Sequence, residues 1–255
     1  MHPPACFLQL RGRAKVVVAL LIATALVSVL SILYELDMRS LLDRVAAGQP
    51  IGLAEAQAAD DRVALAATLS LAALVATSVA FIAWFFRAYV NIERLGAREL
   101  RATKGWSIGV WFIPFLNLIR PKQLMDDIWR ASDPALPAGE VRDWQHAGVP
   151  VLLHGWWAIF LLAGVVSNIA GRMLTNAETL PERANAGEIS MIGDGGIIVA
   201  AILAVLVVRA VTSRQETRAA RLGPANPTAS ATQYPATQPI DAERPNSFPP
   251  PTAAQ

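Results

Sequence analysis

The chain has 255 residues, of which 54% are hydrophobic and 16% are charged, whereas soluble domains average about 25% charged residues. The formal net charge of +2 argues against nucleic-acid binding, and the single cysteine, Cys6, excludes an internal disulfide and a cysteine-based metal cage. Several apolar blocks carry no charge, so the composition predicts an integral membrane protein.

The first apolar block covers residues 16–33 and follows a short basic segment, residues 1–15. A cleaved signal peptide would have a shorter apolar core and a small-x-small cleavage site, so we interpret this block as an uncleaved transmembrane helix. Residues 35–62 form an acidic connection, in which short helices are expected around 38–47 and 53–62.

The second block, residues 63–86, is the clearest span. It carries small residues at helical spacing, which allow another helix to approach closely, and ends in an aromatic belt of Trp84, Phe85 and Phe86. Its helix is expected to leave the membrane and stop near Gly96, a favourable C-terminal cap. A similar stripe of small residues in residues 196–204 makes packing of the second span against the fourth the simplest arrangement.

A Trp/Pro-rich segment, residues 105–132, follows and reads GWSIGVWFIPFLNLIRPKQLMDDIWRAS. Its apolar part, 108–119, would cover under about 20 Å as a helix, short of the roughly 30 Å hydrocarbon core. Basic residues flank both ends. We therefore expect a re-entrant or interfacial segment that is broken at Pro114.

A new helix is expected over residues 121–131, with Pro121 in its first turn. Leu124, Ile128 and Ala131 would form its apolar face. Asp126 and Arg130 are four residues apart and could pair across one turn. Because adjacent positions point about 100° apart, Asp126 and Asp127 are interpreted as part of an exposed face rather than as a catalytic pair.

Two further spans are predicted at residues 149–170 and 189–208, joined by an acidic connection. Residues 213–255 are rich in Pro, Ala and Thr and are predicted to form a disordered tail. The fold class is therefore an all-α integral membrane protein with four transmembrane helices in residues 16–212. Lys and Arg alternate between connections so that both termini are expected in the cytoplasm, in the cell inner (plasma) membrane.

The segment 105–132 resembles DUF4328, a bacterial membrane-protein family that is a domain of unknown function. The resemblance is carried by the order of these residues: Gly105, Trp106, Gly109, Trp111, Phe112, Ile113, Pro114, Asn117, Leu118, Pro121, Ile128, Trp129, Arg130, Ala131 and Ser132. Asp127 stands where the family pattern carries an acid, often Glu. The resemblance covers roughly residues 15–212 and implies the four-span arrangement but no activity, substrate or cofactor.

Three tryptophans, Trp106, Trp111 and Trp129, could line a ligand pocket, but indole rings also anchor at the membrane interface. Pro114 and Asn117 are interpreted as a structural turn, with the broken helix of a transporter as the alternative. The candidate structural site therefore comprises Gly105, Trp106, Trp111, Pro114, Asn117, Pro121, Asp127, Trp129 and Arg130.

His154 is the candidate intramembrane polar residue, because an ionisable group within a span is a functional hypothesis by default. It lies near the start of its span, where a histidine bonded to a backbone carbonyl is the simpler interpretation. Asp194 lies among Gly193, Gly195 and Gly196 and is expected in a turn outside the hydrocarbon.

No metal-ligand spacing, phosphate-binding loop or nucleophile elbow is recognisable, so no catalytic residue, metal site or cofactor is predicted. The leading hypothesis is a non-enzymatic accessory or scaffold component, in contact with the lipid bilayer and with other membrane proteins or itself. A small transporter or channel subunit with a cavity around Trp111, Asn117 and His154 is the alternative. An enzyme acting on lipid is a weaker one.

Overall fold

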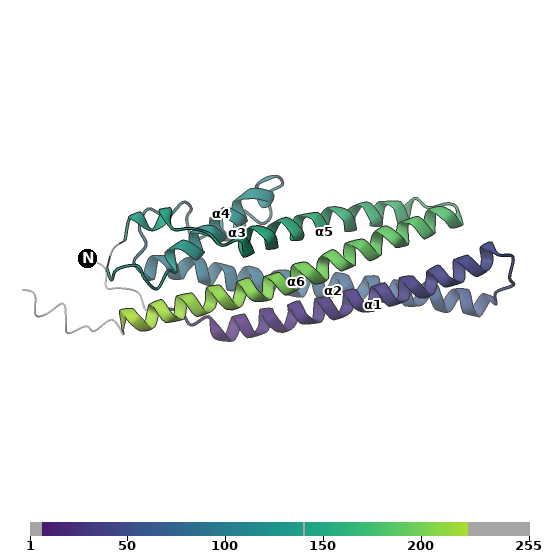
Figure 1. Cartoon of the computed structure of the whole chain (residues 1–255), viewed down its shortest axis with the longest axis horizontal. Helices are drawn as coiled ribbons and strands as arrows, with labels where there is room; N and C mark the ends of the chain where they lie inside the picture. Colours follow the sequence, from purple (N-terminus) through teal and green to yellow (C-terminus); the bar gives the residue numbers. More distant parts are fainter. Residues whose placement is uncertain (1–6, 140, 224–255) are drawn as a thin grey trace, which may run out of the picture.

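The computed structural model describes residues 7–139 and 141–223, and within them the protein is an elongated helical bundle (Figure 1). Its elements in chain order are α1 (Arg11–Ala46), α2 (Leu53–Arg94), α3 (Trp106–Gly109), α4 (Leu116–Ala131), the 3₁₀ helix η1 (Asp143–His146), α5 (Val151–Thr175) and α6 (Leu180–Leu222). The isolated parallel bridge between Ala97 and Val141 is the one β pairing in the described ranges, which contain no strand.

Four helices, α1, α2, α5 and α6, are long and apolar enough to cross a membrane in the described part of the chain. This confirms the predicted all-α membrane protein with four spans. They contain 36, 42, 25 and 43 residues. At about 1.5 Å per residue, the three longest reach about 54–65 Å, so they project well beyond a hydrocarbon core of roughly 30 Å.

Ion pairs between helices explain why the helices run past the predicted spans. At the end of the bundle where α1 ends and α6 begins, Arg39 of α1 pairs with Glu188 of α6, Arg62 of α2 with Asp37 of α1, and Arg183 of α6 with Asp60 of α2. The short helices expected in residues 35–62 are therefore continuous with α1 and α2, and only a tight turn around Gly48 separates them.

The four long helices pack in the order α2, α1, α6, α5. Small polar residues of α2 face α1, where the Oγ1 atoms of Thr24 and Thr77 are 2.9 Å apart. Gly193 of α6 packs on α5, because a Cβ built there would lie 2.8 Å from Oγ of Ser167. The expected packing of the second span against the fourth is wrong, because Ser70 and Thr77 of the small-residue stripe on α2 face Ser31 and Thr24 of α1. α2 and α6 meet instead near the beginning of α1, where Nε1 of Trp84 donates to Oγ1 of Thr212.

Residues 95–147, which we call the cap, cover the end of the bundle where α1 begins and α6 ends (Figure 1). Arg218 of α6 joins the cap to the bundle. Its side chain is only 1% exposed, and its guanidinium group donates hydrogen bonds to the carbonyl oxygens of Leu95, Asp133, Leu136 and Pro137.

Buried polar side chains also correct the predicted start of the tail at residue 213. α6 continues to Leu222, because Gln215 donates to the carbonyl oxygen of Ala88 and Arg218 is held by the cap. Asn91 of α2 donates to the side-chain oxygen of Gln215 and bonds the backbone of Leu8 in the segment before α1. The rest of the predicted tail, residues 224–255, lies outside the described residues.

Gly96 ends α2 as predicted, with Leu95 as C-cap residue and a φ angle of 98° at Gly96. A Cβ at this position would overlap the carbonyl oxygen of Gly139 in the cap. We expect Gly96→Ala to lower the free energy of unfolding by about 2–4 kcal/mol, since it combines a strained φ with a backbone clash.

Gly48→Ala is the matched control for Gly96→Ala. Gly48 has a φ of 73°, but a Cβ added to it would meet no atom within 4 Å, so only the backbone strain of about 1–2 kcal/mol applies. Unfolding of both variants in a graded detergent titration measures the difference. Equal losses would show that the contact between Gly96 and Gly139 adds nothing.

Candidate functional site

The Trp/Pro-rich segment forms two short helices, α3 and α4, joined by turns and by Phe115 at a φ of 65°. Large apolar side chains point out of the protein along this stretch, which lies beside the beginning of α5 (Figure 1): Trp106, Ile108, Phe112, Ile113, Phe115, Leu116, Leu118 and Ile119. An exposed apolar surface next to a transmembrane helix suits an interfacial or re-entrant segment, which stays a prediction.

Trp111 points the other way and wedges between α2 and α5. Its ring meets Phe81 and Phe85 of α2 at centroid distances of 5.8 and 5.5 Å, and Trp157 of α5 at 6.1 Å, all edge to face. Trp156 of α5 joins the same cluster. Edge-to-face geometry stabilises such clusters beyond their buried area. The segment therefore bridges α2 and α5, which also meet directly where the ring centroids of Phe81 and Trp156 are 5.7 Å apart.

α4 begins at Leu116 rather than at Pro121, so Pro121 is inside the helix instead of in its first turn. Proline has no N–H and leaves a carbonyl of the preceding turn without its helical donor. Trp157 of α5 donates its indole N–H to the neighbouring carbonyl oxygen of Leu118 at 2.9 Å. Contacts with α5 thus support the irregular start of α4.

Asp127 is buried, with 1% of its side chain exposed, and Nε of Arg101 lies 3.0 Å from its carboxylate. Burial raises the pKa of the Asp127 carboxyl, and the hydrogen bond from Arg101 opposes that rise. The predicted exposed face of both acids is therefore wrong for Asp127. The exposed position of Asp127 was predicted from the angles between helix positions alone. Those angles contain no information about the loop with Arg101, which covers Asp127 in the structure.

Arg130 does not pair with Asp126 as predicted. Asp126 forms its ion pair with Lys122 instead. Arg130 donates a hydrogen bond to the carbonyl oxygen of Ala147 at 2.9 Å, which links α4 to the end of η1. Trp129 packs under the guanidinium group of Arg214 of α6, whose central carbon lies 4.1 Å from the ring centroid. These motif residues therefore hold the cap to α6 and do not converge on one pocket.

The two bridging tryptophans differ in their N–H groups. Nε1 of Trp157 is bonded to Leu118, whereas Nε1 of Trp111 is buried without a hydrogen-bond partner. Both Trp→Phe changes remove ring volume, but only Trp157→Phe removes a hydrogen bond. We expect Trp157→Phe to destabilise by about 1 kcal/mol more than Trp111→Phe in the same detergent titration. A larger loss for Trp111→Phe would contradict the assigned contacts.

A cavity of about 650 Å³ lies beyond this aromatic cluster, between α1, α2, α5 and α6. Its capped end is closed by the rings of Phe81, Trp111, Trp156 and Phe160. The lining is mostly apolar. α2 and α5 are the two outer helices of the packing order and line the cavity from opposite sides.

Polar side chains are distributed along the cavity wall, and two of them are acidic. Two carboxyl groups, Glu35 of α1 and Asp194 of α6, line the wall, and Ser28 faces Asp194. Neither carboxylate has an ion-pair partner within 4 Å in the described part of the chain. Asp194 is inside helix α6, so the predicted turn is wrong: the glycines at 193 and 196 allow close packing of α6 on α5 there.

Sequence reasoning missed most of these residues. Their signal is a run of polar residues along one face of the first span, at positions 24, 28, 31 and 35, which are three or four residues apart. By contrast, His154 is exposed on α5 and Asn117 is half-buried in α4, and neither lines either of the cavities described here. Gly105 and Pro114 are exposed in the segment and line neither cavity.

Together, the fold and the cavity define a four-span membrane protein with a cavity between its long helices and Trp111 of the Trp/Pro-rich segment at one end of that cavity. The chain belongs to the DUF4328 family: the family model described as "Domain of unknown function (DUF4328)" matches residues 48–213. The resemblance of the motif is thereby confirmed. Comparison with curated proteins and with solved structures returned no match.

Proposed function

We propose that the protein is a non-enzymatic membrane component that binds an amphipathic molecule in the cavity between its four transmembrane helices. The observation that carries the proposal is the cavity itself, which is apolar over most of its wall and includes two carboxyl groups that have no ion-pair partner among the described residues. Pockets for small molecules combine an apolar lining with a few placed polar groups in this way.

The route of entry follows from the packing order. α2 and α5 are the outer helices of the packing order and line the cavity from opposite sides, which supports entry of a molecule from the bilayer between them, beyond the contact of Phe81 with Trp156. The rings around Trp111 close the capped end. The ligand is thus drawn from the lipid phase, and the Trp/Pro-rich segment limits how far the ligand extends toward the cap.

The ligand class follows from the polar groups. A carboxylate in a low-dielectric wall is stabilised by a cation or a hydrogen-bond donor. Asp194 and Glu35 therefore select an amphiphile with an amine or hydroxyl-bearing end and a hydrocarbon body. A fatty acid of the same length would place two like charges together.

Binding of an alkylamine with a fluorophore at the end of its chain tests this proposal, with the corresponding fatty acid as the matched probe. In lipid nanodiscs we expect saturable binding of the amine and about tenfold weaker binding to Asp194→Asn. Equal binding of both probes by wild type, or unchanged amine binding by the variant, would contradict the assigned role of Asp194.

Transport is a second candidate, favoured by the proposed entry from the bilayer between α2 and α5. In that case the protein would carry the amphiphile between leaflets rather than only hold it for a partner, as an accessory or scaffold component would. Reconstituted vesicles with a quenchable alkylamine separate the two: exchange between leaflets above that of empty vesicles favours transport, and binding without exchange favours the accessory role.

The orientation we propose places the cap and both termini in the cytoplasm of a cell inner (plasma) membrane. Lys and Arg are concentrated in the N-terminal segment, the cap and the end of α6. Positively charged segments remain on the cytoplasmic side during insertion.

A further inference from the structure

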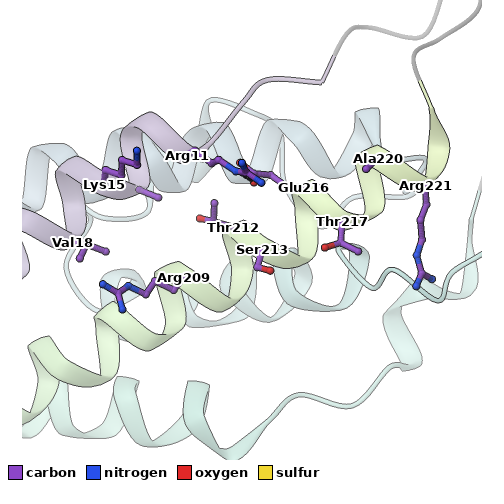
Figure 2. Close-up of a pocket in the computed structure, with 11 residues that line it drawn as sticks. Arg11, Lys15, Val18, Arg209, Thr212, Ser213, Glu216, Thr217, Ala220 and Arg221 are labelled. Carbon is purple, nitrogen blue, oxygen red and sulfur yellow. Dashed lines mark hydrogen bonds and ion pairs between the residues drawn. The ribbon is translucent and has the colours of Figure 1, made fainter.

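A second cavity, of about 680 Å³, lies outside the bundle centre in a groove between the first turns of α1 and the last turns of α6. Figure 2 shows its lining residues along these two helices. Four of them are basic, namely Arg11, Lys15, Arg209 and Arg221, and the only acid is Glu216. The motif segment and the proposed ligand cavity contribute no residue to it.

The charges of this groove are only partly neutralised. Glu216 pairs with Arg11, and Arg221 donates to the carbonyl oxygen of Pro134. Lys15 and Arg209 have neither an ion pair nor a hydrogen bond within the described residues, and both are exposed. Two cations on facing helices therefore remain available for an anion.

The depth of the groove follows from the sequence. Lys15 is the last charge before the uncharged stretch of α1, and Arg209 is the first after that of α6. Both therefore lie at the level of the lipid headgroups. Exposed apolar side chains continue from them toward the membrane centre, with Ile22 on α1 and Ile202 and Leu206 on α6. A lipid bound here has hydrocarbon surface for its chains.

We propose that this groove binds the phosphate of an anionic phospholipid, with Lys15 and Arg209 contacting the phosphate oxygens. Basic pockets between transmembrane helices at the membrane surface suit such headgroups. The hydroxyl groups of Thr212, Ser213 and Thr217 add hydrogen-bond donors to the lining. The exposed apolar strip favours a lipid over a free phosphate ion.

The test titrates phosphatidylglycerol, phosphatidylcholine and inorganic pyrophosphate against the full chain in detergent, with bound species counted by native mass spectrometry. We expect wild type to retain phosphatidylglycerol selectively and the double variant Lys15→Gln/Arg209→Gln to bind it about tenfold more weakly or worse. Arg209→Lys keeps the charge and should retain most of the binding, which separates the site from a folding defect.

A double variant outside the groove, Lys104→Gln/Arg120→Gln, removes the same charge from the cap and serves as the control. It should bind phosphatidylglycerol like wild type. Equal loss in both double variants would overturn the proposal in favour of diffuse surface attraction. Saturable binding of pyrophosphate with the same affinity as phosphatidylglycerol would also overturn the proposal, because the groove would then recognise free phosphate.

Discussion

Arg218→Met is expected to detach the cap and to be among the most destabilising single changes in the protein. The Arg218 guanidinium group donates to four backbone carbonyls from two chain segments, and one of these, the carbonyl of Asp133, also accepts from the backbone N–H of Leu136. Methionine fills a similar volume but removes the donor that Arg218 supplies to the carbonyls of Leu95, Leu136 and Pro137. A loss of about 3 kcal/mol or more follows from the cost of buried unsatisfied acceptors.

The change should appear as an apparent Tm lower by about 6–12 °C in a fluorescence melt of the purified protein. Arg221→Met is the matched control, because Arg221 is exposed, is also on α6 and donates only one hydrogen bond, to Pro134. It should melt close to wild type. A similar loss in both variants would mean that the general charge of this end matters rather than the contacts of Arg218.

Gly164→Phe is expected to abolish ligand binding without unfolding the protein. Gly164 lines the cavity on α5, and a Cβ there meets no atom within 4 Å, so a large side chain can enter the empty space. Replacing glycine within a helix also removes its entropic cost of about 0.5–1 kcal/mol. Stability should therefore hold or rise while binding of the fluorescent alkylamine falls below detection.

Gly155→Phe provides the control for Gly164→Phe. Gly155 is on the same helix, its Cβ position is equally open, and it does not line the cavity. The control should bind the alkylamine like wild type. Loss of binding in both variants would indicate an effect on α5 as a whole, and retained binding in Gly164→Phe would place the ligand elsewhere.

The sequence predicted the membrane architecture well because the spans are long and free of charge. The span at residues 63–86 and the end of α2 at Gly96 were identified from local sequence patterns, and the structure has a helix over those residues and a positive φ at Gly96. Helix lengths beyond the spans were harder to predict. The charges at positions 37, 39, 60 and 62 indicate a polar connection when only the sequence is considered, whereas in the structure they stabilise helices by pairing across the bundle.

The candidate site shows the same limit. Trp111 was identified, but its role as a wedge depends on aromatic residues of α2 and α5 that are far away in the sequence. Asp194 was placed in a turn because glycines flank it, although those glycines allow close packing on α5. Which side of a helix faces a cavity depends on the packing order of all four helices, and no local pattern contains that order.

Disulfide cross-linking in native membranes tests the central claim, a cavity between the long helices with the proposed entry between α2 and α5, most directly. In a Cys6→Ser background, the pair Thr24→Cys/Thr77→Cys should cross-link on oxidation, because these side chains meet across α1 and α2. The pair Ser70→Cys/Asn168→Cys, which line the cavity on α2 and α5, should remain reduced. Rapid cross-linking of Ser70→Cys/Asn168→Cys, with none between positions 24 and 77, would contradict both the packing order and the cavity.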